Sequence, residues 1–519
     1  MSKEPYSVIH WFRRGLRLHD NAALLEALKP INDGDRFILR PVYIIDPWYK
    51  ANVKCGQNRT RFLLQSLQDL DNSLRKLGSS LYVARGDPVE VFEKLFTKWE
   101  VKKITWEVNT EPYARERDRK VSSVAKMLKV KVTECDGHTL YNLDFLLSKN
   151  NGNVPLTQQK FTSLVTSIGH PAKPQKAPEC LKKFAPSSEV EKELELPSHD
   201  EFYLDESASG KCLFPGGETE ALKRLEEKIC FENAKWVREF EKPLTSPNSL
   251  EPSTTVLSPY VTHGCLSSRT FYWKLFDVYE GAKHSKPPVS LKGQLFWREF
   301  FYTVGAHTEN FDKMVGNKIC RQIPWESNEE KLNAWKNSQT GFPFIDAVMT
   351  QLREEGWIHH LARHSVACFL TRGDFWQSWE KGKEVFEEYL LDHDWSLNAG
   401  NWMWMSASAF FHHYYRVYSP VAFGKKTDPT GAYIRKYLPQ LEKFPNEFIY
   451  EPWKAPLSVQ KDLGVIIGVD YPKPIVDHGT ASKQNITKMK AAFAAASKAK
   501  AQNDADFSPP SKKKSKLLE

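Results

Sequence analysis

Two histidines spaced four positions apart could handle protons in this chain. His360 and His364 stand in the sequence WIHHLARHSVACF, and on a helix they would share one face. Neighbouring imidazoles can pass a proton near neutral pH, because an unperturbed histidine titrates there. Packing in a core is the ordinary alternative, and metal ligation is a third. No H-E-x-x-H motif or cysteine pair completes a metal site, so we predict none.

A carboxylate and amide array follows downstream. Asp392, Asp394 and Asn398 stand in DHDWSLN, and together they could hold the edge of a ring that both donates and accepts hydrogen bonds. Arg363 is the expected ion-pair partner of one aspartate. The alternative is a polar cap at the start of a helix, with the carboxylates in solvent.

Tryptophan is concentrated around these groups. Six of the sixteen tryptophans lie between Gly356 and Tyr418. Tryptophan is large, redox-active and suited to stacking, and its N–H needs a partner when it is buried. Packing in a helical core would be the ordinary explanation. Because titratable groups lie among the rings, the segment predicts the site of a large, planar, redox-active cofactor.

Hydroxyl groups and a cation precede this segment. Residues 249–269, SLEPSTTVLSPYVTHGCLSSR, are rich in Ser and Thr and lead into a helix. Hydroxyls at a helix start suit a diphosphate, although a simple cap is their commoner use. Gln294 and Arg298 lie four apart and could add a donor and a positive charge on one helical face.

Composition narrows the class of protein. The 519 residues are 41% hydrophobic and 26% charged, and no apolar run reaches the roughly 18 residues of a membrane span. The N-terminus lacks a signal-peptide pattern, so we expect an intracellular protein.

Eight scattered cysteines without a C-x-x-C pair argue against a zinc ribbon or a disulfide scaffold. Most of the net charge of +9 lies in residues 480–519, so a nucleic-acid site elsewhere needs a local basic patch.

The first 145 residues alternate short apolar runs with amphipathic segments. We expect strands at 7–12, 37–45, 80–86, 103–108 and 131–137, and helices at 59–77, 88–99 and 112–129. This order predicts an α/β N-terminal domain with a doubly wound parallel sheet over residues 1–145. The chain has neither a G-x-G-x-x-G nor a P-loop motif, which weakens an NAD or nucleotide-triphosphate assignment.

Three further regions follow. Residues 146–215 are rich in Pro, Ser and Lys and predict an interdomain linker. Residues 216–480 are patterned as a large all-α domain that carries the candidate site. Residues 481–519 form a basic tail that we expect to be disordered.

Six long motifs follow one another along the chain in a characteristic order. They are WFRRGLRLHDN, TTVLSPYVTHGCLS, QLFWREFFY, GWIHHLARHSVACFLTRGDFW, DWSLNAGNWMW and RVYSPVAFGKKTDPTGAYIRKYLP. In this order the chain resembles the photolyase/cryptochrome family, and closely the animal-type branch that contains the (6-4) photolyases. The resemblance covers about nine-tenths of the chain. It implies an N-terminal α/β domain and a helical FAD- and lesion-binding domain.

The resemblance also implies a role for each matching residue. Cofactor contacts are expected from Thr254, Thr255, Ser258, Gln294, Arg298, Arg363, Asp392, Asp394 and Asn398. Electron transfer is expected through Trp402, Trp379 and Trp325, with Trp376 as a fourth member. His360 and His364 are the expected catalytic pair. A damaged base is expected to contact Gln294, Trp297, Trp404 and Tyr418, with Lys242 as a looser candidate.

The function implied by this resemblance is light-driven repair of (6-4) pyrimidine–pyrimidone photoproducts. Reduced FAD would supply an electron, and His360 or His364 a proton, to a lesion flipped out of UV-damaged double-stranded DNA. A cryptochrome, acting as a flavin photoreceptor or transcriptional regulator, is the alternative. Repair of cyclobutane dimers fits the motifs less well, and a plain DNA-binding module would not need the array. The RVYSP sequence, Asn398 and the short tail favour repair.

Other expectations concern the setting of the protein. We expect a monomer with no membrane contact, located in the nucleus, because SKKKSK (511–516) resembles a nuclear-localisation cluster. A solvated lysine-rich tail is the alternative explanation. Arg13 and Arg14 fit the family's opening motif but leave open whether a deazaflavin or folate antenna chromophore binds in addition to FAD.

Overall fold

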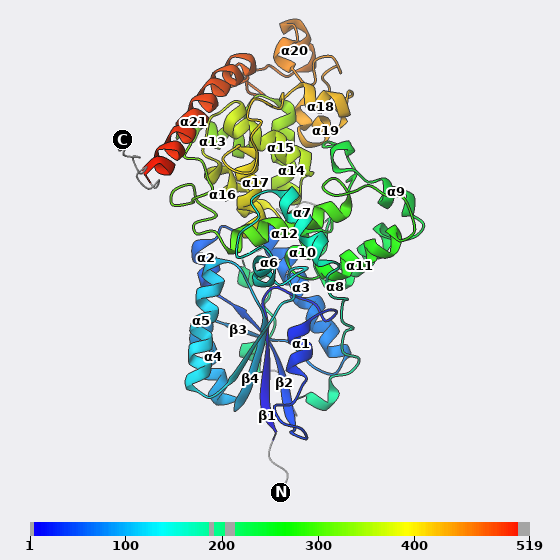
Figure 1. The fold of residues 1–519 in the computed structure, drawn as a ribbon. Coiled ribbons are helices and arrows are strands. Elements are labelled where there is room, and N and C mark those ends of the chain that lie inside the picture. The colour runs from blue at the N-terminus through cyan, green and yellow to red at the C-terminus, as the bar shows by residue number, and fades with distance from the viewer. Residues whose placement is uncertain (1–4, 186–190, 203–212, 507–519) are drawn as a thin grey trace, which may run out of the picture.

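The structure, a computed structural model, describes residues 5–185, 191–202 and 213–506. An α/β domain and a larger helical domain are stacked end to end, and the first strand begins at the end of the α/β domain that is remote from the helical domain (Figure 1). No helix in these ranges is long and apolar enough to cross a membrane. The expected two-domain architecture is confirmed.

The N-terminal domain is built on a five-stranded parallel sheet. Its order is β3-β2-β1-β4-β5, so the chain winds outward from β1 in both directions, as the doubly wound prediction requires. The strands are β1 (Tyr6–Phe12), β2 (Phe37–Ile45), β3 (Tyr82–Arg85), β4 (Val101–Glu107) and β5 (Lys131–Cys135). The helices are α1 (Ala22–Ala27), α2 (Pro47–Asn52), α3 (Gln57–Lys76), α4 (Pro88–Lys98) and α5 (Pro112–Met127).

Alternate residues of the strands pack into two different cores. Val8 and Phe12 of β1 contribute to the core that includes α3, whereas Ile9 and Trp11 contribute to the core that includes α4 and α5. Both faces are therefore covered, which explains why the strands appear in the sequence as apolar runs. The predicted start of α4 is also confirmed, since the Asp87 side chain accepts from the backbone N–H of Val89 at 2.8 Å.

The segment expected to be a linker contains regular structure. Helices α6 (Leu143–Lys149) and α7 (Gln158–Ile168) lie at its beginning. Phe161 and Leu164 of α7 are buried against α12 (Leu291–Ala306), in the same core as Phe296 and Phe300. The difference arises because α7 buries only a narrow apolar face in a segment that is otherwise polar.

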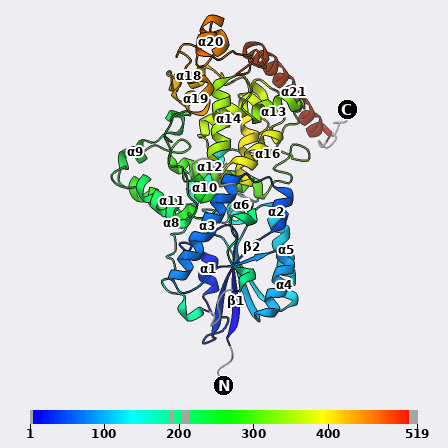
Figure 2. The same cartoon turned by 180° about the vertical axis from the view of Figure 1, so that it is seen from behind.

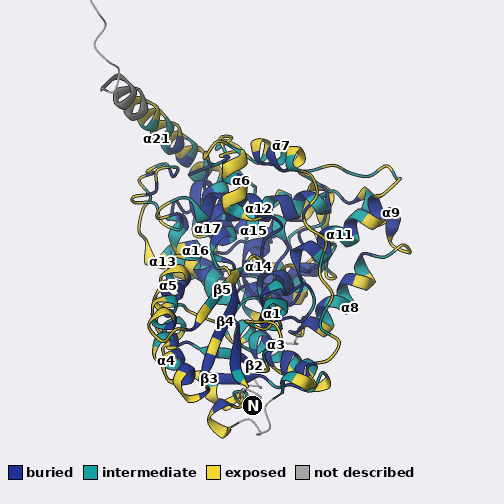
Figure 3. Ribbon diagram, turned by 60° about the horizontal axis from the view of Figure 1, so that its bottom comes forward, coloured by how far each residue is buried: buried dark blue, intermediate teal, exposed yellow. Residues whose placement is uncertain are grey.

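Helices make up the C-terminal domain, as predicted. In addition to α12 they are α8 (Glu218–Lys228), α9 (Ala234–Glu239), α10 (Ser258–Thr262), α11 (Ser268–Tyr279), α13 (Glu329–Lys336), α14 (Pro343–Glu355), α15 (His360–Cys368), α16 (Trp379–Tyr389), α17 (Trp395–Met405), α18 (Ala422–Thr427), α19 (Ala432–Tyr437), α20 (Leu457–Leu463) and α21 (His478–Asp506). Buried residues fill the middle of this domain (Figure 3). Two glycines permit its closest packing: a Cβ on Gly382 would lie 2.1 Å from the Trp402 ring, and one on Gly400 would lie 2.2 Å from Phe301.

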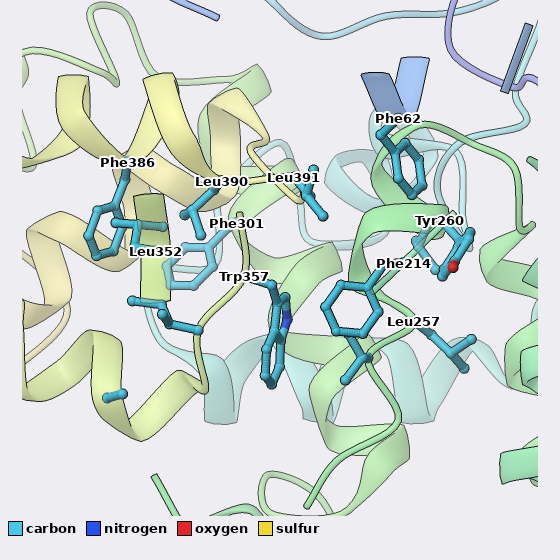
Figure 4. Packing of buried hydrophobic residues seen from close by; sticks show 14 of the residues in the cluster. Phe62, Phe214, Leu257, Tyr260, Phe301, Leu352, Trp357, Phe386, Leu390 and Leu391 are labelled. Atoms are coloured by element: carbon cyan, nitrogen blue, oxygen red, sulfur yellow. The ribbon is translucent and has the colours of Figure 1, made fainter. Parts of the chain in front are cut away.

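The two domains share one continuous core and several polar contacts. Aromatic and leucine side chains from α3, α10, the segment around Trp357 and the α16–α17 connection lie close together in this core (Figure 4). Helix α3 reaches from the sheet to the helical domain (Figure 2), where Arg59 donates to the Glu387 carbonyl at 2.8 Å. Arg269 of α11 forms a two-pronged ion pair with Asp20, with both contacts at 2.9 Å. Apolar packing and charged hydrogen bonds thus join the two domains.

The structure differs from the expectation of a disordered tail over residues 481–519. Helix α21 extends from His478 through this region to Asp506, and the remaining tail, including the SKKKSK cluster, lies outside the described residues. Met489 is fully buried, and Asn485 donates to the Gly373 carbonyl at 3.1 Å. The apolar contacts of α21 are few and widely spaced, so the composition of the segment does not reveal them.

Candidate functional site

The two histidines lie side by side on α15, as the sequence predicts. Their Nε2 atoms are 2.8 Å apart, and His364 Nδ1 lies 3.2 Å from the Tyr418 hydroxyl. One imidazole must donate to the other, so the two rings and the phenol form a short polar chain. Tyr418, which the resemblance assigns to the damaged-base pocket, therefore contacts the histidine pair.

Positive charge surrounds the histidine pair. Burial and then Lys242 and Arg372 lower the pKa of His364 to about 3. Burial and Lys242 are also the largest causes that hold the pKa of His360 well below its usual value. Burial, with Arg363 nearby, lowers the pKa of Lys242 itself to about 8. Lys242 thus belongs to this site, and both imidazoles are neutral at pH 7 in the free protein.

Asp392 joins three segments of the helical domain. Arg363 donates two hydrogen bonds to its carboxylate, at 3.0 and 2.9 Å, which confirms the predicted ion pair. The Ser258 hydroxyl, at the start of α10, donates to the same carboxylate at 2.6 Å. The hydroxyl-rich segment is therefore brought to the carboxylate array, although the two are 134 residues apart in the sequence.

Asp394 caps the start of a helix, which is the alternative role given above for the carboxylates of this array. Its side chain caps α17 by accepting from the Leu397 N–H at 3.1 Å. It also accepts from Arg14, at 3.0 Å, and from the Tyr302 hydroxyl. Arg14 comes from the N-terminal domain, so Asp394 anchors the two domains together. It is not an Asp in solvent, and its part in holding a cofactor remains a prediction.

Helix α12 contributes an arginine, a glutamine and an aromatic ring. Arg298 donates to Glu299 at 2.8 Å, whereas its Nη2 is buried without a partner among the described residues. The Gln294 amide donates to the Pro288 carbonyl at 3.2 Å, so part of its donor capacity is used by the backbone. Trp297 meets Trp404 edge to face, with ring centroids 5.0 Å apart. The two rings expected at a damaged base are thus adjacent.

The remaining cofactor candidates are placed as follows. Thr254 and Thr255 are buried just before α10, and the Thr255 carbonyl accepts from Arg224 at 2.8 Å. Asn398 lies on α17, one turn beyond Asp394, and its amide donates to the Lys383 carbonyl at 3.0 Å. Sequence reasoning assigned no role to Arg14 or Tyr302, because both act through contacts between distant segments. It also assigned none to His393, whose contacts with Asn398 and Glu387 depend on the turn before α17.

The four tryptophans form two groups. Trp402 and Trp379 are buried on the packed helices α17 and α16, and the Trp402 N–H has no partner among the described residues. Trp325 and Trp376 form a pair with ring centroids 4.7 Å apart, and Trp376 donates to the Pro324 carbonyl at 3.0 Å. Trp376, the expected fourth member, lies directly against Trp325.

The donor set fits a flavin dinucleotide. Ser258 supplies a hydroxyl, Arg363 a cation held in place by Asp392, and Arg298 a buried N–H without a partner in the described part of the chain. Phosphates and a ring that accepts hydrogen bonds need such groups. In the described part of the chain, no cluster of His, Cys, Asp and Glu has the arrangement of a metal site.

Comparison with protein families matches both halves of the chain. Residues 290–491 match the FAD binding domain of DNA photolyase, and residues 8–179 match DNA photolyase. The helical domain is therefore an FAD-binding domain, and FAD is its cofactor.

Curated relatives give the same family. The chain is 51% identical to cryptochrome-1 of Sylvia borin over 489 residues, which cover 93% of this chain and 78% of that protein. It is 50% identical to cryptochrome-2 of Gallus gallus over 487 residues, covering 93% of this chain and 82% of the relative.

Solved structures resemble the whole fold. A bacterial class III photolyase from Agrobacterium tumefaciens matches with a TM-score of 0.80 and 28% identity over 95% of this chain and 99% of that one. A Synechocystis cryptochrome matches with a TM-score of 0.81 and 28% identity over 94% and 100%. An archaeal photolyase from Sulfolobus tokodaii, solved with two FAD molecules, has a TM-score of 0.73 and 26% identity over 93% and 100%. Together with the site, these similarities establish that the chain belongs to the photolyase/cryptochrome family.

Proposed function

We propose that this chain repairs (6-4) photoproducts in DNA under light. The observation that carries the proposal is the direct contact between His360 and His364, with their Nε2 atoms 2.8 Å apart and Tyr418 bonded to the second ring. Such a chain can hold and deliver one proton, which the reaction at the lesion needs. The surrounding rings and cations supply binding surfaces for a base and a phosphate.

Different residues of the site would bind the base, attract the DNA backbone and supply the proton. When bound, FAD supplies the photoexcited electron. Trp297 and Trp404 offer ring faces on which a flipped base can stack. Lys242 places a positive charge beside the histidine pair, where an anionic backbone would be attracted. An arriving phosphate counters that charge and raises the pKa of the imidazoles, so the proton donor forms only when substrate is bound.

The cofactor is held by groups that are fixed before it binds. Arg363 is locked by two hydrogen bonds to Asp392, and Asp394 is locked by Arg14 and the start of α17. Trp402, Trp379, Trp325 and Trp376 extend from the buried part of α17 toward α21, and they would relay electrons from an external reductant at the protein surface to the bound cofactor. This arrangement lets the site be reduced by light without a mobile donor entering it.

A cryptochrome is the second candidate, and the comparisons support it at least as well. The curated relatives named above are cryptochromes and share about half of their residues with this chain. In that function the same FAD and tryptophans would report light to a protein partner, and the histidine pair would not meet a lesion. The motif RVYSP and Asn398 favour repair, whereas the identities favour signalling.

Selective binding of damaged DNA separates the two candidates. The repair proposal predicts that the purified chain binds a duplex with one (6-4) photoproduct at least tenfold more tightly than the matched undamaged duplex, about 1.4 kcal/mol. Equal affinity for the two duplexes contradicts it and favours the cryptochrome. Measuring both at two salt concentrations separates lesion recognition from attraction to phosphate.

The setting of the protein is part of the proposal. We propose that it acts as a monomer in the nucleus, with the basic cluster at 511–516 directing import. Deleting residues 508–519 should reduce nuclear accumulation of a fluorescent fusion. Unchanged accumulation would remove the assignment without affecting the repair proposal.

A further inference from the structure

His393 is a buried titratable group that the proposed function does not use. It lies in the turn before α17, between the two aspartates of the array, and is 8% exposed. Its Nδ1 is 3.2 Å from Asn398 Nδ2, and its Nε2 is 3.4 Å from a Glu387 oxygen. The imidazole therefore connects a carboxylate of α16 to the amide of α17.

The contacts of Asn398 fix which way its amide points. Nδ2 donates to the Lys383 carbonyl at 3.0 Å, and a carbonyl can only accept, so the NH2 group faces Lys383 and His393. His393 Nδ1 must then accept the second amide proton. No described residue forms a hydrogen bond with Asn398 Oδ1, so this oxygen is the group left for a ligand.

The tautomer and charge of His393 agree with this arrangement. Because Nδ1 accepts, the ring proton is on Nε2, which lies toward the Glu387 carboxylate. Burial and nearby cations hold the pKa of His393 well below its usual value, so the ring stays neutral. A protonated ring would present N–H to the amide NH2 and break the contact. The groups that lower its pKa are Arg59, Arg14, Lys383 and His263.

We propose that His393 is a positioning residue that holds the Asn398 amide with its oxygen, and not its NH2 group, toward the flavin ring. The inference rests on the proposed function and on the cofactor contact that the family resemblance implies for Asn398. In the reduced flavin ring, the nitrogen that would face Asn398 carries a hydrogen, whereas in the oxidised ring the same nitrogen can only accept a hydrogen bond. An acceptor oxygen at this position therefore favours the reduced ring. His393 thereby makes the bound FAD easier to reduce.

The test is a redox titration of the full chain loaded with FAD, followed by flavin absorbance and without DNA. His393→Ala frees the amide to turn, and we expect about a tenfold lower ratio of reduced to oxidised FAD at the wild-type midpoint, which is about 30 mV for two electrons. His393→Asn keeps an acceptor near the position of Nδ1 and should retain the wild-type potential. His170→Ala is the control, because His170 is an exposed histidine far from α17 in sequence, and its Nδ1 lies 2.8 Å from the Tyr272 hydroxyl.

Several results would overturn the proposed role of His393. A wild-type potential in His393→Ala with full FAD content overturns the inference, as does a shift in His393→Asn equal to that in His393→Ala. In an Asn398→Ala background, His393→Ala should add no further shift, and an additional shift overturns action through Asn398. If His393→Ala does not fold, the apolar variant His393→Leu takes its place in the titration. If neither variant folds, a reduction potential of His393→Asn that differs from the wild-type value overturns the inference.

The result is separable from the proposed repair. The titration contains no DNA, so a protein that fails to repair lesions can still show the predicted shift. Conversely, if the reduction potential of bound FAD is the same in all variants as in the wild type, the inference fails but the repair proposal is unaffected. A wild-type chain that retains no FAD overturns both.

Discussion

The Nε2 atoms of His360 and His364 lie 2.8 Å apart, on successive turns of α15. Lys242 is the largest charge-related cause of the low pKa of each ring, after burial. Both imidazoles are therefore neutral at pH 7 in the free protein, and in the proposed repair reaction a change in their electrostatic surroundings would make one of them a proton donor. In the proposed function, Lys242 would link substrate binding to the supply of that proton.

Replacing Lys242 with Met should raise the pKa of both histidines toward the ordinary value near 6.5. The folded pKa of His364 is depressed to about 3, so its stabilising contribution is present above pH 6.5 and is lost as pH falls toward 3. Lys242→Met should make that loss smaller. Proton NMR titration of the imidazoles measures the pKa values, and Lys443→Met, an exposed lysine, serves as the control. Unchanged imidazole pKa values in Lys242→Met would contradict the linkage.

Substituting Trp379 with Phe should slow light-driven reduction of bound FAD by more than an order of magnitude. The residue is buried on α16, between the buried Trp402 region and the Trp325–Trp376 pair in the proposed path. The swap removes a redox-active ring but keeps most of the volume, so we expect a stability loss of only about 1 kcal/mol.

The matched control is Trp335→Phe. Trp335 is equally buried and its ring lies 6.2 Å from Trp402, but it is outside the proposed path and donates to the Val366 carbonyl at 3.0 Å. Photoreduction should stay near the wild-type rate in this variant. Equal slowing in both would show that packing around Trp402, and not electron transfer through Trp379, sets the rate.

Replacing Asp392 with Ala should remove bound FAD and destabilise the fold by about 3 kcal/mol, because Arg363 is left without its partner. Asp392→Asn keeps the shape and one acceptor for Arg363, so we expect a smaller loss of both. Urea denaturation and the flavin absorbance of the purified protein measure the two effects. Full FAD content in Asp392→Ala would show that the ion pair does not organise the cofactor site.

Deleting residues 478–519 should expose the outer tryptophan pair. Lys488 of α21 lies over the Trp376 ring at 5.1 Å, and His478 forms an ion pair with the buried Asp374 at 2.7 Å. We expect increased quenching of tryptophan fluorescence by iodide and a loss of at least about 3 kcal/mol in unfolding free energy. Deleting only residues 507–519 leaves α21 in place and should change neither quantity. Identical quenching in the two truncations would contradict a covering role for α21.

Local patterns in the sequence were sufficient for much of the fold. The strands of the N-terminal domain are short apolar runs, and the start of α4 carries its own Asp87–Pro88 signal, so both were predicted. The contact between His360 and His364 follows from helical spacing alone. The Arg363–Asp392 pair could be anticipated from opposite charges in neighbouring motifs.

Contacts between distant segments could not be predicted in the same way. Arg14 and Asp394 are 380 residues apart in sequence, and neither motif indicates the other. The packing of α21 depends on a few side chains, such as Met489, within a polar and lysine-rich segment. His393 was passed over because its role comes from a turn that places it beside Asn398 and Glu387.

The most direct test of the central claim is repair of synthetic (6-4) and cyclobutane lesions by the full chain, under blue light and in darkness. We expect that only the (6-4) lesion is restored, only in light, and that His364→Ala abolishes this activity while retaining FAD. No repair of either lesion by a protein whose FAD is bound and photoreducible would contradict the account and leave the cryptochrome function in its place.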